Sequence, residues 1–159
     1  MVAEFLSESW IAAFAEAVAV VPRTVDDGET FVVEQRVTGG PHGDICYHIV
    51  FAADRIDVRS GNASNPDITL TTSFDTAVAL HRGETNAQCA IADGGMRVRG
   101  AFDALLRHAA TFSTLSDAFA ELRASTSWPT LPMTGLPPST GEDEPVASPR
   151  RSRARKLSP

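Results

Sequence analysis

The most constraining part of this sequence is residues 67–100, which read DITLTTSFDTAVALHRGETNAQCAIADGGMRVRG. Residues 67–72 and 96–100 each alternate between polar and apolar side chains, the period-2 pattern of a half-buried strand. Between them, Ser73 and Asn86 can each cap a short helix, and glycines stand where both helices would stop. The pattern therefore predicts a strand, two short helices and a second strand whose arginines point outward.

Three further strands are predicted upstream of this stretch. Residues 31–37, 45–52 and 56–59 carry apolar runs or alternations that are bounded by turn-forming residues. The connections between them are short, a turn-rich loop at 39–44 and a turn at 53–54. Because such short connections cannot cross over a sheet, we expect these strands to pair antiparallel.

Amphipathic helices are predicted at both ends of the folded region. The first begins after Ser7, a favourable N-cap, and ends at Pro22. Its polar face carries acids, whereas a helix that lies on a membrane surface would want bases, so we expect it to pack on the core. The last helix follows Gly100, and Thr114 or Ser116 is expected to divide it near residue 115. The apolar stripe of the first helix is Trp10, Phe14, Ala17 and Val21.

These elements together predict an α+β fold. It consists of a mostly antiparallel five-stranded sheet that helices cover on one face. We expect the folded domain to occupy residues 1–128, which carry a net charge of −8, because the whole chain carries −6 and the remainder +2. An acidic body argues against specific nucleic-acid binding, because neutralising phosphates requires clustered lysine and arginine.

Residues 129–159 differ sharply in composition from the rest. They hold seven of the ten prolines and few large apolar groups, so they cannot bury enough apolar surface to offset the entropy of ordering. We expect a disordered Pro-rich tail with a basic end at 150–156. That end has three interpretations: a solubilising segment without a specific partner, a weak patch for anionic surfaces, or a nucleic-acid contact. The tail is also the candidate site for a protein partner.

The start of the chain is apolar but unlike an export signal. Three acids interrupt the apolar stretch, and no base precedes Arg23. No window of about 20 apolar residues is present, so no transmembrane span is expected and the protein is predicted to be cytoplasmic. Cys46 and Cys89 lack metal-ligand spacing, and we expect both to be reduced, small core residues.

Motifs for catalysis are missing from the sequence. It has no nucleophile elbow, phosphate loop or dinucleotide fingerprint, and no histidine or cysteine pair at zinc-ligand spacing. We therefore expect no metal, no cofactor and no enzymatic activity. His48 is interpreted as a satisfied structural residue on a strand. An enzyme would need His48 or His81 to project into a cavity beside a carboxylate.

The 67–100 region resembles the sterol carrier protein type 2 domain family, in its small stand-alone bacterial form. The resemblance rests on the DITLTT strand, the AVAL helix followed by Arg82-Gly83-Glu84, the Ala87-Gln88 helix start and the MRVRG strand before Leu105-Leu106. A weaker likeness extends from about Phe5 to Trp128. The family often has an acid directly after the last strand glycine, whereas Ala101 stands here and Asp103 could begin the next helix instead.

The resemblance implies a sterol-carrier-like function. Domains of this family hold their helices apart from the sheet and leave an apolar tunnel for a sterol or an acyl chain. The chain is accordingly expected to bind or carry a hydrophobic small molecule or lipid. The alternative is an accessory protein-interaction module with a filled core, which supports a partner enzyme. The candidate ligand-binding residues are Phe14, Ile49, Phe51, Phe74, Val78, Ile91, Phe102, Leu105, Leu106 and Phe112.

Overall fold

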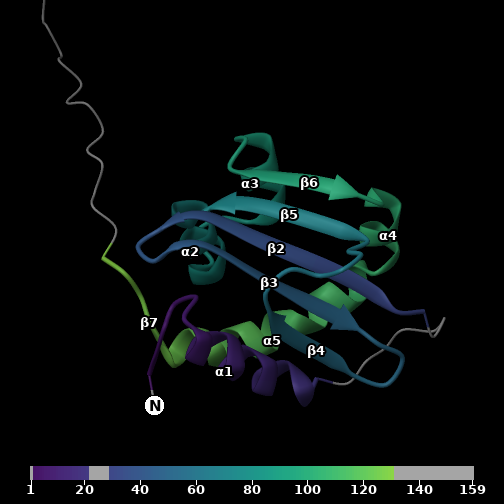
Figure 1. Cartoon of the computed structure of the whole chain (residues 1–159), viewed down its shortest axis with the longest axis horizontal. Helices are drawn as coiled ribbons and strands as arrows, with labels where there is room; N and C mark the ends of the chain where they lie inside the picture. Colours follow the sequence, from purple (N-terminus) through teal and green to yellow (C-terminus); the bar gives the residue numbers. More distant parts are fainter. Residues whose placement is uncertain (1, 22–28, 131–159) are drawn as a thin grey trace, which may run out of the picture.

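The structure of the protein is a computed structural model, and it describes residues 2–21 and 29–130. Pro22, which was expected to end the first helix, and the expected disordered tail beyond Thr130 lie outside these residues. The described part is an α+β fold built on a five-stranded sheet (Figure 1).

The five-stranded sheet has the strand order β4-β3-β2-β5-β6. Strands β2, β3 and β4 form an antiparallel meander, β5 pairs parallel with β2, and β6 pairs antiparallel with β5. The predicted class, a mostly antiparallel sheet with helices, is confirmed. The bounds of the strands are Phe31–Gly40 for β2, Gly43–Phe51 for β3, Ile56–Ser60 for β4, Ile68–Ser73 for β5 and Met96–Gly100 for β6.

Five helices complete the described fold, and side-chain caps explain where three of them start. The side chains of Ser7, Ser73 and Asn86 each accept a hydrogen bond from the backbone N–H three residues further on. All three N-caps were predicted from the sequence. The helices are α1 (Glu8–Ala19), α2 (Phe74–Arg82), α3 (Ala87–Ala92), α4 (Phe102–Arg107) and α5 (Ala109–Ala124).

Helices cover one face of the sheet, and the period of the strands decides which face. Phe31, Val33 and Val37 of β2 are buried in the core, whereas Arg97 and Arg99 of β6 are exposed on the open face, as expected. Figure 1 shows α1 and α5 lying together near β4 at one edge of the sheet, and α3 beside β6 at the other edge. A ligand bound in the core of this domain would therefore lie between the sheet and the helices.

A small clasp holds the two ends of the described chain together. Two-residue strands β1 (Ala3–Glu4) and β7 (Thr126–Ser127) pair in parallel, and the Trp10 indole N–H donates to Oγ1 of Thr126 at 3.1 Å. The sequence did not predict this pair, because two residues are too few to display a period. The clasp fixes α5 against α1.

Two predicted boundaries were wrong. The helical break near residue 115 does not exist: α5 runs unbroken through Ala109–Ala124, and the break falls at His108. His108 is buried and its ring stacks on Phe31, with ring centroids 4.6 Å apart, so packing turns the chain there. The loop expected at 39–44 is instead a tight hairpin, in which only Pro41 and His42 lie between β2 and β3.

Two smaller expectations also need correction. On α1 the fully buried residues are Trp10, Ile11, Phe14 and Val18, so Ile11 and Val18 add to the predicted stripe, whose Ala17 and Val21 are partly buried against the same core. The cysteines are both free, as expected, but Cys89 is exposed on α3 and Cys46 is only partly buried, and neither belongs to the hydrophobic core.

The open face of the sheet contains a buried acid that the sequence did not reveal. Glu34 is 1% exposed; its Oε1 accepts from Nε of Arg36 at 2.6 Å and its Oε2 accepts from the backbone N–H of Ala63 at 2.8 Å. Nearby, Nδ1 of His48 lies 2.8 Å from the carbonyl oxygen of Gly61. These contacts hold the loop after β4 against the sheet, so the structural interpretation of His48 is confirmed.

Candidate lipid-binding site

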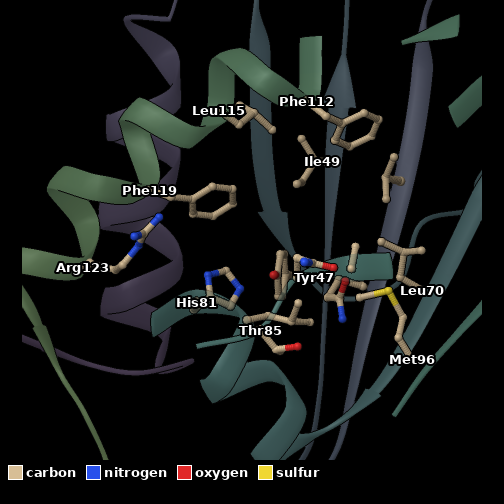
Figure 2. A pocket seen from close by; sticks show the side chains of 15 residues that line it. Tyr47, Ile49, Leu70, His81, Thr85, Met96, Phe112, Leu115, Phe119 and Arg123 are labelled. Carbon is tan, nitrogen blue, oxygen red and sulfur yellow. The ribbon is translucent and has the colours of Figure 1, made fainter. Parts of the chain in front are cut away.

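A cavity of about 350 Å³ lies between the sheet and the helices. Its walls come from β2, β3, β5 and β6 on one side, and from α2, the α2–α3 connection and α5 on the other. Figure 2 shows the side chains converging on this space from both layers. The cavity falls in the size range of small-molecule binding sites, which are typically lined mainly by apolar side chains.

Most of the cavity wall is apolar. Inward-facing residues of the strands meet the apolar stripe of α5, in which Leu115 and Phe119 are spaced four residues apart. Phe112 lies one turn before Leu115 and also lines the space. The strand contribution consists of Val33, Ile49, Leu70 and Met96.

Two of the six polar residues that line the cavity, His81 and Arg123, lie together at one end of it (Figure 2), which we call the polar end; the other four are Gln35, Tyr47, Thr85 and Asn86. His81 comes from the last turn of α2, Arg123 from the last turn of α5, and Tyr47 from β3 (Figure 2). His81 faces inward because it stands four residues after Ala77 and three after Val78, both of which are buried. None of these three side chains has a hydrogen-bond partner within residues 2–21 and 29–130.

His81 is held in its neutral form by its surroundings. Its ring packs against Phe5, Trp10 and Phe119, with centroids 5.0 to 5.3 Å apart. This burial, together with the nearby charge of Arg123, lowers the pKa of His81 from 6.5 to about 4. Burial also raises the pKa of Tyr47, so its hydroxyl stays protonated and can donate a hydrogen bond.

The lowered pKa predicts a loss of stability in acid. As the pH falls from about 6.5 toward 4, the unfolded chain binds a proton at this histidine and the folded chain does not. The free energy of unfolding should therefore fall over this window, by up to about 3 kcal/mol from this residue, and the contribution is complete above pH 6.5. Urea unfolding of wild type and His81→Phe at several pH values measures it. His81→Phe should lose this dependence of the unfolding free energy on pH, whereas His42→Gln, at an exposed position, should keep it. Equal pH dependence in all three proteins would contradict a lowered pKa of His81.

Two of the residues predicted to bind ligand, Ile49 and Phe112, line the cavity. Five others are packed in or against the surrounding core without lining the cavity: Phe14, Phe51, Phe74, Val78 and Leu105.

Three predicted ligand-binding residues lie on the surface. Ile91, Phe102 and Leu106 have exposed fractions of 41%, 52% and 64%. The short helices α3 and α4 each bury one alanine fully, Ala90 and Ala104, and leave these larger residues outside. A direct role for all ten predicted residues in ligand contact stays a prediction.

The sequence reasoning missed the polar end of the cavity. It noted His81 only for an enzyme and did not consider Arg123 or Thr85. A signal was present for the arginine, because Leu115, Phe119 and Arg123 follow one another at intervals of four on a single helical stripe. A charged residue that continues an apolar stripe indicates a place where the interior is not simply packed.

The cavity lining offers little for catalysis or metal binding. Its fifteen residues include no aspartate or glutamate, so His81 has no carboxylate beside it in the cavity. Within the described part of the chain, no group of three or more histidine, cysteine or acidic residues is placed to hold a metal ion. Nor does that part contain a helix with the length and apolar character needed to cross a membrane.

The sequence assigns this fold to a known family of domains. The family model for the SCP-2 sterol transfer family matches residues 22–125, so the chain belongs to that family. Members of this family bind lipids and sterols and are typically non-catalytic, although some homologues are domains of enzymes. No curated protein matches the chain.

Solved structures show the same fold at low sequence identity. The conserved hypothetical protein TT1886 of Thermus thermophilus matches with a TM-score of 0.57 and 15% identity, over 80% of this chain and 93% of that one. A crystal structure of sterol carrier protein 2 matches with a TM-score of 0.54 and 14% identity, over 77% and 99%. Palmitated SCP2L2 of Aedes aegypti matches with a TM-score of 0.50 and 18% identity, over 64% and 91%.

Proposed function

We propose that this protein is a non-enzymatic carrier that binds a hydrophobic ligand, such as a sterol, a fatty acyl chain or a similar lipid, in the cavity between sheet and helices. The cavity itself carries the proposal: about 350 Å³ of space with mainly apolar walls in the middle of a small domain. An apolar ligand in this space would remove its mainly apolar walls from water, which favours binding.

The expected affinity follows from burial of the acyl chain. About twelve buried methylenes would contribute roughly 10 kcal/mol at about 0.8 kcal/mol each. With the association cost taken at its lower bound of about 4 kcal/mol in lost translational and rotational freedom, the remaining free energy corresponds to a Kd on the order of 10–100 µM before any polar contact is counted.

Titration with a fluorescent fatty acid tests the proposal. We expect saturable binding of one ligand per chain, with a Kd on the order of 10–100 µM. Native mass spectrometry of the protein purified from its own host should show a co-purified lipid mass. A folded protein that binds neither a fluorescent fatty acid nor a fluorescent sterol, and that carries no lipid, would contradict it.

The accessory-module hypothesis is less well supported. It required a filled core, whereas the described residues leave this cavity between the two layers.

A further inference from the structure

We propose that the polar end of the cavity binds the anionic head group of a long-chain carboxylate through Arg123, so that the protein prefers an acid to a neutral lipid of the same length. This inference rests on the proposed function and specifies the chemistry of its ligand. It is carried by three observations: a cation without an ion pair in the described part of the chain, two uncharged hydrogen-bond donors that line the same cavity, and an apolar region away from the cation (Figure 2).

Arg123 is the only charged residue among the fifteen that line the cavity. Its Nε atom is buried and has no hydrogen-bond partner, and within residues 2–21 and 29–130 its guanidinium group makes no ion pair. The Nη1 atom lies against Gly83 at the C-terminal end of α2. Arg123 as a whole is only partly buried, but a carboxylate placed beside its guanidinium group would supply the opposite charge and the acceptor that the described residues do not.

The neighbouring polar groups suit a single negative charge. Tyr47 is buried and protonated, and His81 is neutral near pH 7, so each can donate a hydrogen bond without adding charge. Glu84, which follows α2, pairs with Arg82 at 3.6 Å and does not line the cavity. The site therefore carries a net charge of about +1, which one carboxylate neutralises, and a planar guanidinium can bind a carboxylate through two hydrogen bonds.

The rest of the cavity accommodates the chain of such a ligand. Figure 2 shows Arg123 and His81 on one side of the space, and Phe112 and Ile49 away from them across it. An amphiphile could thus place its carboxylate beside Arg123 and its hydrocarbon against the apolar walls. A sterol would present only a hydroxyl to the polar end and would leave the positive charge unmatched.

Comparing the affinities for an acid and for its ester tests this inference separately from the proposed function. The proposed function requires that a lipid binds, whereas the inference requires that the acid binds more tightly than the ester. The probes are cis-parinaric acid and its methyl ester, whose fluorescence rises on binding; a fluorescent sterol is the third arm. We expect the wild-type protein at pH 7.5 to bind the acid at least about tenfold more tightly than the ester, as expected for hydrogen bonds to a charged group. Arg123→Met should remove this preference by weakening the acid and leaving the ester unchanged, and Arg123→Lys should keep part of it.

A matched control is Arg107→Met on the exposed side of α4, where the arginine pairs with Asp103 at 3.6 Å. It should bind both probes as the wild type does. Equal binding of acid and ester by the wild type, or a sterol bound as tightly as the acid, would overturn the inference while the carrier function stands. Absence of binding for all three probes would overturn both. If Arg123→Met does not fold, as judged by circular dichroism, the wild-type ratio and Arg123→Lys still decide.

Discussion

Leu70→Trp should reduce the affinity for a fluorescent fatty acid at least about tenfold while the protein remains folded. Leu70 lies on β5 with its side chain in the cavity (Figure 2), and it is only partly buried by the core. The larger indole would occupy space that the ligand needs, and a ligand excluded from several methylene contacts loses about 0.8 kcal/mol for each. Because the added volume enters a cavity rather than a filled core, the overpacking cost of about 1–3 kcal/mol should be small here.

Leu106→Trp is the matched control for this prediction. Leu106 is 64% exposed on α4 and does not line the cavity, so the same change there should leave the affinity unaltered. Fluorescence titration and thermal melts of both variants measure the outcome. If Leu70→Trp binds like the wild type, or if Leu106→Trp loses binding instead, the ligand does not occupy this cavity.

Gly100→Ala should lower the free energy of unfolding by at least about 3 kcal/mol, as expected for a collision combined with backbone strain. Gly100 ends β6 with φ of +114°, a conformation that side chains rarely tolerate. A methyl group there would also be driven into the carbonyl oxygen of Asp67, the residue whose backbone holds the start of β5 beside β2. The carbonyl cannot move away easily, because it accepts a hydrogen bond from the N–H of Ala101 at 3.1 Å.

Gly61→Ala separates backbone strain from collision. Gly61 also has a positive φ, +91°, but an added methyl group there meets no atom within 4 Å. We expect this variant to lose only about 1 kcal/mol, the cost of left-handed backbone alone. Urea denaturation of both variants gives the comparison. Similar losses at the two positions would show that the close approach of Gly100 to Asp67 is unimportant.

The sequence was sufficient to predict the elements of the fold, because their causes are local. The alternation in residues 67–72 and 96–100, the caps at Ser73 and Asn86 and the glycines after them depend only on neighbouring residues. The antiparallel meander followed from short connections. Family membership followed in turn, because the order and spacing of these elements are what the SCP-2 family shares.

Boundaries were less predictable where tertiary contacts decide them. His108 interrupts the C-terminal helices because its ring is buried against Phe31, a residue 77 positions earlier in the chain. The β1–β7 clasp depends in the same way on segments from the two ends of the described chain. A local pattern contains no information about such partners.

The cavity is the feature that only the tertiary structure decided. Apolar residues on two layers predict that the layers meet, but whether their side chains fill the space depends on the distance between the layers. That distance was not visible in the sequence, and it left Phe102 and Leu106 outside while Ile49 and Phe112 line the cavity. His81 and Arg123 lie 42 positions apart in the chain, and only the packing of α2 against α5 brings them to one end of the same cavity.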